Sequence, residues 1–460
     1  MQQFFLRIFF LATFYLCFPL LHAQVNSPYS RIGLGNIFPT TFTGSNGMAG
    51  LSVAQFGEGL LYNNIQFNNP ATYSYLSKTV FDVGLYANFL TLQTSTEQFT
   101  SGDANLSYFA LGFSPNNKKT RHDVGFSTGL IPFSGFQYNI EQDSSDLIDT
   151  LIGLQTTNYR GTGQLNQFYI GGAYNYKFGK DTLRQGNFHN SIGAGINIGY
   201  LFGSLENITV ASFPETSNSY STKYVRDTEI GGGLFSAGIT YQTTFGKYDL
   251  GTKDEKKSDT LYTLNFGASF SPQLAVNGTQ SVSWFTILKL GDVESITDTL
   301  LIENDTSATI LIPSQFNLGL SFNNYKTLDD KRTKFSVGAE FTTALWSNFE
   351  GFQYSDSLQN SYRVKLGTEI IPPRNKKDKR LITYRFGAYA GKSQLVINNT
   401  QLSDFGITAG TGLPVGISRL NLSANLGFRG YNADLNETYV NFGLGFNLND
   451  LQWFQKRQQN

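Results

Sequence analysis

Apolar and polar residues alternate with a period of two in one segment after another of this chain, and this pattern restricts the folds open to it. In residues 192–200 one face carries only glycines and an asparagine, and the other carries Ile192, Ala194, Ile196, Ile198 and Tyr200. Successive side chains of a β-strand point to opposite faces of the sheet. The alternation therefore predicts strands with one apolar face and one face of small or polar residues.

Fourteen segments follow this pattern. They lie at residues 79–92, 106–114, 123–134, 163–178, 189–203, 229–245, 260–273, 312–324, 333–345, 361–371, 382–393, 404–412, 419–430 and 437–448. Short charged turns, such as "PPRNKKDKR", alternate with long predicted loops at 135–162, 203–228 and 272–311. An even strand number with alternating short and long connections is typical of a transmembrane antiparallel β-barrel. A water-soluble β-sandwich remains the alternative fold.

Composition supports a membrane barrel. The chain has 40 Phe, 25 Tyr and 47 Gly, and its 34 Lys and Arg balance its 34 Asp and Glu. An apolar outer face and a polar lumen together give this mixture. The balanced charge argues against binding to nucleic acid. The lysine-rich runs in the short turns are interpreted as solvated tips.

The first 23 residues predict a secretory signal peptide, because an arginine precedes an apolar run that ends in small residues. Cys17, the one cysteine of the chain, lies within it. After this segment no apolar run approaches the roughly 20 residues of a spanning helix. We therefore expect export of the chain and insertion into the cell outer membrane.

Residues 24–78 do not alternate and precede the first strand. A segment of this length is too long for a simple tail and has enough apolar residues to pack, so we expect it to form a hatch inside the barrel. The barrel itself is predicted at residues 79–448, and residues 449–460 are predicted to be a periplasmic tail.

Several motifs resemble the FadL-like outer-membrane transporters of long-chain fatty acids and other hydrophobic compounds. They are "GSNGMAG" at Gly44–Gly50, Asn69-Pro70-Ala71, "LIPSQFNLGLSF" at 311–322 and much of the C-terminal third. The resemblance implies a fourteen-stranded barrel for passive uptake of a hydrophobic small molecule. It also implies a hatch that closes the lumen and a kinked third strand that releases the ligand sideways into outer-membrane lipid.

The end of the third predicted strand carries Pro132 and Phe133, and Gly135 and Phe136 follow directly after it. Proline cannot donate to a strand ladder and glycine weakens a strand, so a gap in the wall would cost least here. One hypothesis places the Asn69-Pro70-Ala71 corner against this gap as part of a gate. The other is that Pro132 ends the strand at the rim and that Asn69 opens an ordinary Asn-Pro turn.

A second functional interpretation stays open, since a fold shared with transporters does not determine function. The PorV-like branch of such barrels binds exported proteins, and its function lies in secretion or outer-membrane assembly. The expected partners are therefore a hydrophobic ligand, lipid, the barrel-assembly machinery during biogenesis, and a secreted or surface protein.

No pattern for catalysis, metal or cofactor binding is present in the sequence. Outside the signal peptide the histidines are His122 and His189, both at predicted turns. Neither is placed as the base of a serine hydrolase. No enzyme activity, metal or cofactor is therefore expected.

Six charged residues of the later strands point inward by the alternation: Glu340, Arg363, Lys365, Glu369, Arg385 and Arg429. Buried charges need partners. Either these residues form a salt-bridged network that holds the hatch, or Arg385 or Arg429 binds the carboxylate of a fatty acid.

Overall fold

The computed structural model describes residues 27–56, 64–115, 121–144, 155–179, 190–213, 220–249, 258–290, 293–328, 331–352, 358–373, 381–431 and 433–450. The predicted signal peptide, most of the predicted C-terminal tail and His189 lie outside these residues. The lysine-rich turns at 116–120 and 374–380 also lie outside them.

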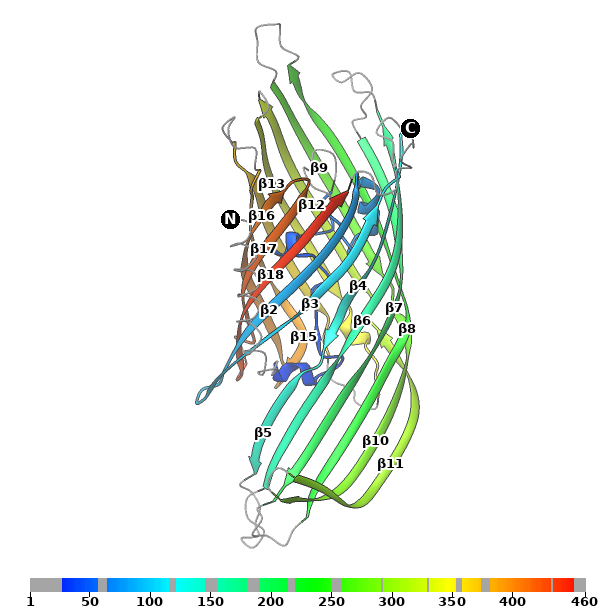
Figure 1. The fold of residues 1–460 in the computed structure, drawn as a ribbon, viewed down its shortest axis with the longest axis vertical. Coiled ribbons are helices and arrows are strands. Elements are labelled where there is room, and N and C mark those ends of the chain that lie inside the picture. The colour runs from blue at the N-terminus through cyan, green and yellow to red at the C-terminus, as the bar shows by residue number, and fades with distance from the viewer. Residues whose placement is uncertain are drawn as a thin grey trace, which may run out of the picture.

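Fourteen antiparallel strands form a closed barrel (Figure 1). In order around the wall they are β2 (Thr79–Gln93), β3 (Gln98–Phe113), β4 (His122–Gly135), β6 (Gln155–Phe178), β7 (Asn190–Ser212), β8 (Ser221–Asp249), β9 (Ser258–Ser271), β12 (Gln315–Leu328), β13 (Lys331–Ala344), β14 (Ser361–Ile371), β15 (Thr383–Ile397), β16 (Thr400–Val415), β17 (Ser418–Arg429) and β18 (Asn436–Asp450). Pairing of β18 with β2 closes the ring. Each predicted strand overlaps one of these, so the predicted barrel is confirmed.

The period-two pattern separates the two faces of the wall. In β7 the side chain of Ile198 is 63% exposed on the outside, whereas Asn197 beside it is 1% exposed. Exposed Phe, Ile, Leu and Tyr side chains continue this apolar outer surface over the neighbouring strands. An apolar outer band of this kind faces lipid in a transmembrane barrel. No helix among the described residues has the length and apolarity needed to cross a membrane.

β2 starts and β18 finishes at one end of the barrel, and we call the opposite end the distal end. Three further strands extend the wall at the distal end (Figure 1). β5 (Tyr138–Ser144) pairs with β6, β10 (Leu274–Leu290) pairs with β8, and β11 (Val293–Ile312) pairs with β10. The predicted loops at 135–162, 203–228 and 272–311 were therefore wrong. The outward side chains there include the exposed Asp227 and Glu229, so the outward positions at the distal end are no longer consistently apolar.

The N-terminal segment, residues 27–56 and 64–78, packs against the inner wall. It comprises η2 (Pro28–Arg31), β1 (Asn36–Ile37), α2 (Thr43–Asn46) and η3 (Pro70–Tyr75); the short η4 (Trp346–Asn348) follows β13. A Cβ atom on Gly195 of β7 would lie 2.6 Å from Ala71 N, and one on Gly387 of β15 would lie 2.4 Å from Ala49 N. Glycine is needed at both places because the two backbones approach so closely.

Tyr73 anchors η3 in an apolar cluster between this segment and the wall. Its ring is fully buried in a cluster with Phe67, Tyr108 and Tyr169. Burial raises the pKa of Tyr73 well above its usual range, so the hydroxyl stays protonated and donates to Asn197 Oδ1 at 3.0 Å. The N-terminal segment is thus fixed by both packing and a buried hydrogen bond.

Candidate functional site

Pairing between β3 and β4 stops partway along the wall. The ladder joins only Phe109–Phe113 to Phe126–Leu130, although β3 continues to pair with β2 as far as Gln98. On its other side β4 pairs with β6, with an irregularity between Pro132 and Ser134. Proline has no N–H to donate, and a bulge bends a strand. We call this place, where β4 turns away from β3, the β3–β4 interruption.

The N-terminal segment covers β4 at the interruption from inside. Asn36 and Ile37 of β1 pair with Gly135 and Ser134, and Phe38 N donates to Phe133 O at 3.0 Å. These contacts satisfy backbone groups that β3 does not reach. β1 is therefore the element that occupies the freed edge of β4.

Phe136 lies just beyond the interruption. Its ring is 3% exposed and packs edge-on against Tyr138, with ring centroids 5.4 Å apart. Its N–H donates to Gly163 O at 2.9 Å. Of the four residues predicted at the wall gap, Pro132 and Phe133 line the lumen, whereas Gly135 pairs with β1 and Phe136 packs in the distal core.

The Asn69-Pro70-Ala71 corner lies elsewhere. Asn69 caps η3, with its Oδ1 accepting from Ala71 N at 3.2 Å. Its Nδ2 donates to Val53 O at 2.8 Å and to Ile239 O of β8 at 3.1 Å. The corner thus fixes the N-terminal segment against β7 and β8. The structure does not bring it together with Pro132–Phe136, and a gating role for it stays a prediction.

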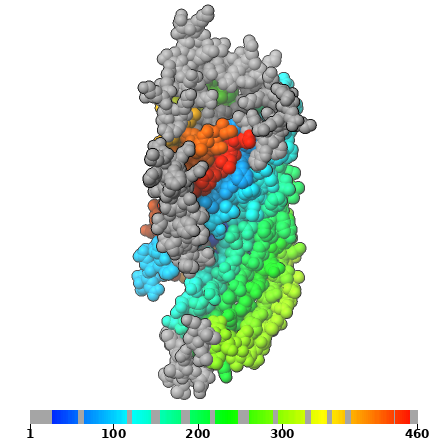
Figure 2. Space-filling view, in the orientation of Figure 1, coloured from blue at the N-terminus to red at the C-terminus, as the bar shows by residue number. Residues whose placement is uncertain are grey.

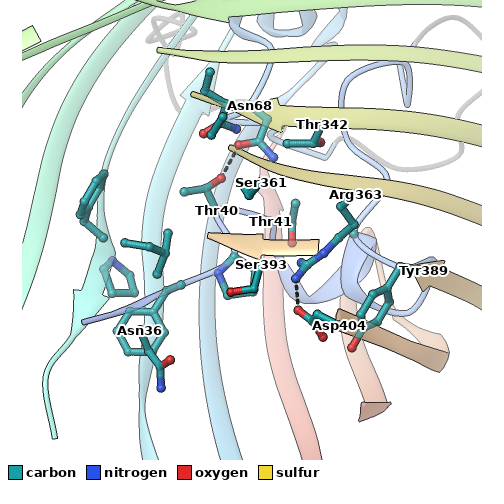
Figure 3. A pocket seen from close by; sticks show the side chains of 18 of the residues that line it. Asn36, Thr40, Thr41, Asn68, Thr342, Ser361, Arg363, Tyr389, Ser393 and Asp404 are labelled. Atoms are coloured by element: carbon teal, nitrogen blue, oxygen red, sulfur yellow. Dashed lines mark hydrogen bonds and ion pairs between the residues drawn. The ribbon is translucent and has the colours of Figure 1, made fainter. Parts of the chain in front are cut away.

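A cavity of about 470 Å³ lies between the N-terminal segment and the wall (Figure 3). Ser107 of β3 and Pro132 and Phe133 of β4 line it, so it reaches both borders of the interruption. Its apolar lining includes Ile37, Phe38, Phe67 and Leu90. Its polar lining includes Thr40, Asn68, Thr342, Arg363, Tyr389 and Asp404. The cavity therefore has the two-sided character that suits an amphipathic or apolar molecule.

Glu340 and Lys365 hold the N-terminal segment directly. Glu340 Oε1 accepts from Lys365 Nζ at 2.8 Å, and Oε2 accepts from the backbone amides of Ser52 and Val53 at 2.8 and 2.9 Å. Lys365 Nζ also donates to Gly50 O at 3.4 Å. A buried carboxylate with a cation and two N–H donors is well satisfied.

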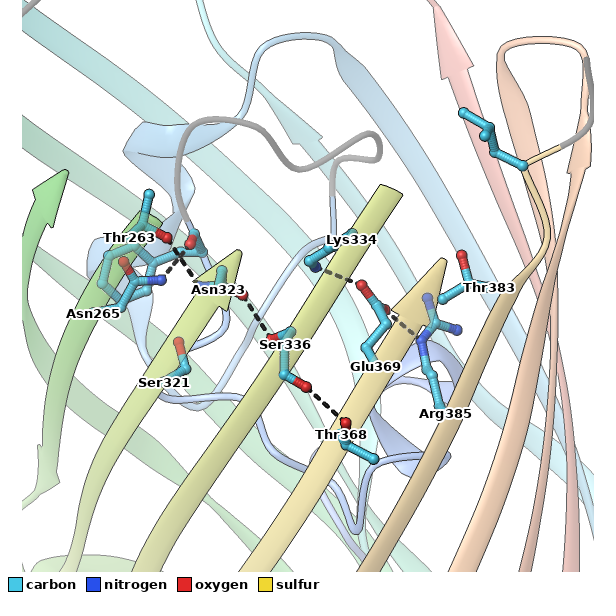
Figure 4. A network of polar contacts seen from close by, with 12 residues as sticks. Thr263, Asn265, Ser321, Asn323, Lys334, Ser336, Thr368, Glu369, Thr383 and Arg385 are labelled. Carbon is cyan, nitrogen blue, oxygen red and sulfur yellow. Dashed lines mark hydrogen bonds and ion pairs between the residues drawn. The ribbon is translucent and has the colours of Figure 1, made fainter. Parts of the chain in front are cut away.

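Glu369 joins two cations in a second network (Figure 4). Its carboxylate pairs with Lys334 through Oε1 and with Arg385 Nε at 2.7 Å through Oε2. Arg385 Nη1 donates to Asn421 Oδ1 at 2.9 Å, and the arginine is 1% exposed. Arg385 is therefore engaged within the wall beneath α2 and does not line the cavity.

A third network borders the cavity. Arg363 pairs with Asp404, which also accepts from the Tyr439 hydroxyl at 2.7 Å. The Tyr439 and Tyr389 hydroxyls lie 2.7 Å apart. This group combines the partly exposed guanidinium of Arg363 with hydroxyl groups at the cavity surface, which is a suitable place for a polar ligand group.

Arg429 connects the same region to the N-terminal segment. Its Nη1 donates to Asn36 Oδ1 at 3.0 Å and lies 3.5 Å from Glu437 Oε2. Ser27 donates to the other oxygen of Glu437. Sequence reasoning missed Asp404 and Glu437, although they are the first residues of two predicted strands and the alternation places both on the inward face.

Three comparisons place this structure among known proteins. A protein-family model described as BamG matches residues 5–460. No curated protein matches the chain. The toluene transporter TodX of P. putida is 15% identical with a TM-score of 0.51, covering 90% of this chain and 99% of that one.

Two more solved structures are similar. The Ralstonia pickettii toluene transporter TbuX is 14% identical with a TM-score of 0.49, covering 89% of this chain and 98% of that one. A FadL homologue of Pseudomonas aeruginosa is 13% identical with a TM-score of 0.48, covering 90% of this chain and 98% of that one. At such identities the likeness to TodX shows a shared fold, and the FadL-like barrel predicted from the sequence is confirmed at that level.

Proposed function

The chain belongs to the BamG family, and we propose that it is an outer-membrane barrel that passes hydrophobic small molecules sideways from its lumen into the bilayer. The observation that carries this proposal is the reach of the cavity to Ser107 on one border of the β3–β4 interruption and to Pro132 and Phe133 on the other. An apolar ligand moving down its gradient needs only an apolar path and an exit into lipid, so no energy source is required.

The ligand class follows from the lining. A volume of about 470 Å³ falls in the range of pockets for small organic molecules. The related fold of TodX is that of a toluene transporter, which supports an apolar ligand. Arg363, although paired with Asp404, has the more exposed guanidinium at the cavity (37%, against 21% for Arg429), and with the Tyr389 hydroxyl it would bind the polar end of a longer molecule such as a fatty acid. Arg385 does not line the cavity.

In this proposal the N-terminal segment is the hatch, and β1 with Phe38 is its moving part. β1 is only two residues long and pairs with the edge that β4 turns away from β3. The Asn69-Pro70-Ala71 corner and Glu340 hold the rest of the hatch in place. Ligand would leave when β1 separates from β4.

A ligand-binding experiment tests the cavity. Thr342 lines it, and the Thr342 hydroxyl has no hydrogen-bond partner in the described structure, so Thr342→Trp fills space without removing a bond. Phe341, next to it, is 40% exposed on the outer face, and Phe341→Trp is the matched control. We expect a fluorescent fatty acid to bind the purified barrel and the control, and not Thr342→Trp. Equal binding by all three would reject the cavity as the site.

A second candidate function is favoured by the family itself, whose name links it to the barrel-assembly machinery. In this view the barrel binds a partner during outer-membrane assembly or secretion, and the cavity is incidental. Deletion of the gene should then lower the amounts of other outer-membrane proteins. If the Thr342→Trp protein, expressed in the deletion strain, restored those amounts, the assembly function would be favoured. If deletion of the gene left the amounts unchanged, the assembly function would be excluded.

A further inference from the structure

β11 is a long strand with a free edge. It has 20 residues and a ladder with β10 on one side. Within the described residues the other side carries only the bridge between Leu311 and Glu350, at the end nearest the barrel. Figure 2 shows the β10–β11 hairpin along the lower right border of the molecule. An edge of this length offers a row of backbone N–H and C=O groups for another strand.

The side chains of this edge strand are unusually exposed. Residues 294–307 are exposed on both faces, and Ile296, Leu300 and Ile302 are 60%, 51% and 54% exposed. Natural edge strands are commonly protected by lysine, by proline or by being short. β11 has no proline and no lysine. Its length and its exposed aliphatic side chains therefore indicate a surface that pairs with another chain.

Charge identifies the kind of chain. β11 carries Glu294, Asp298, Glu303 and Asp305 and no basic residue. Lys223 of β8 pairs with Glu294 at 2.7 Å. The other three acids are exposed, and no salt bridge to them occurs among the described residues. A strand added here therefore meets apolar side chains interspersed with unneutralised carboxylates.

We propose that the free edge of β11 binds an extended segment of another protein, rich in alternating basic and apolar residues, by adding it as a strand to the barrel wall. Main-chain hydrogen bonds would supply affinity, and the carboxylates would select the basic segment. A second copy of this chain fits poorly, because two β11 edges would bring like charges together. The exposed stretch of β11, residues 294–307, lies at the distal end and does not line the cavity, so this inference does not depend on ligand passage.

The test uses the purified full-length barrel in detergent and two synthetic peptides, one alternating lysine and valine and the other alternating glutamate and valine. We expect the lysine peptide alone to bind. Asp298→Lys combined with Glu303→Lys should weaken its binding about tenfold, as expected for reversing two surface charges. Fluorescence anisotropy of the labelled peptide measures the affinity.

The matched control is Asp227→Lys combined with Glu229→Lys. These acids are also exposed at the distal end, but β8 is paired there on both sides, with β7 and with β10. The control should bind the lysine peptide like the unsubstituted barrel. Equal weakening in both double variants would show general attraction to a basic peptide and overturn the assignment to β11.

Hydrogen exchange on the unsubstituted barrel gives a result that does not depend on the folding of any variant. Strand addition should slow exchange of β11 backbone amides when the lysine peptide binds. Binding without this protection, equal binding of the glutamate peptide, or self-association through β11 without peptide would each overturn the proposal.

Discussion

Glu340 and Ser52 are separated by 288 residues in sequence, and Glu340 Oε2 accepts a hydrogen bond from Ser52 N at 2.8 Å. The same oxygen accepts from Val53 N, and the other oxygen pairs with Lys365. One buried wall carboxylate thus orients the backbone of the N-terminal segment. This contact gives a reason for charge inside the barrel: it fixes the segment that packs against the inner wall.

Glu340→Gln should loosen this attachment. Glutamine keeps an oxygen acceptor but removes the charge, and Lys365, 8% exposed, is left without its carboxylate. Breaking a buried pair costs about 3–5 kcal/mol. We expect faster hydrogen exchange at residues 50–55, with the barrel strands little changed. Glu229→Gln, an exposed change on β8, is the control; equal exchange in the two variants would show that Glu340 does not hold the segment.

Gly387→Ala should displace α2 and the residues after it. The added Cβ would lie 2.4 Å from Ala49 N, whose hydrogen bond to Thr408 Oγ1 at 2.8 Å would be lost. Overpacking of this kind costs about 1–3 kcal/mol. Gly233→Ala is the control, because nothing lies within 4 Å of its new methyl group. Limited proteolysis should cleave the N-terminal segment faster only in Gly387→Ala, and unchanged cleavage would contradict the close packing.

The losses in free energy of unfolding caused by substituting Lys334 and Arg385, which both pair with Glu369, should be strongly non-additive. After Lys334→Met, Glu369 keeps Arg385, and after Arg385→Met it keeps Lys334. The double variant leaves a buried carboxylate without any cation. Its loss in free energy of unfolding should exceed the sum of the single losses by about 1–3 kcal/mol. Urea unfolding of the refolded barrel measures this, and simple additivity would show that each cation acts alone.

The barrel itself is predictable from sequence because lipid imposes a strong rule on its outer face. Ile196 and Ile198 must face outward and Asn197 inward, and the same constraint marks every strand of the wall. β10 and β11 were missed because their apolar residues do not keep a sustained alternation. Their ladder contains three register shifts, and residues 294–307 of β11 are exposed on both faces, so a search for period-two alternation does not find them.

The site is less predictable for a different reason. Alternation identifies Glu340 and Lys365 as inward residues that can pair with each other, but their further partners are backbone amides and a carbonyl of the N-terminal segment, which no side-chain pattern reveals. Pro132 signals an irregular strand, yet nothing in the sequence indicates that Ile37 and Phe38 cover it. Such contacts depend on the path of a segment without regular structure.

The measurement that tests lateral passage most directly is a reversible tether between Ile37 and Ser134. These residues face each other across the β1–β4 pair, and paired strand positions suit a disulfide. The double variant Ile37→Cys with Ser134→Cys would be expressed in a Gram-negative host that lacks its own hydrophobic-compound channel. The uptake of radiolabelled oleate by these cells would then be measured. Our account predicts background uptake when the tether is oxidised and wild-type uptake after reduction. Equal uptake in both states, or none in the unsubstituted protein, would contradict it.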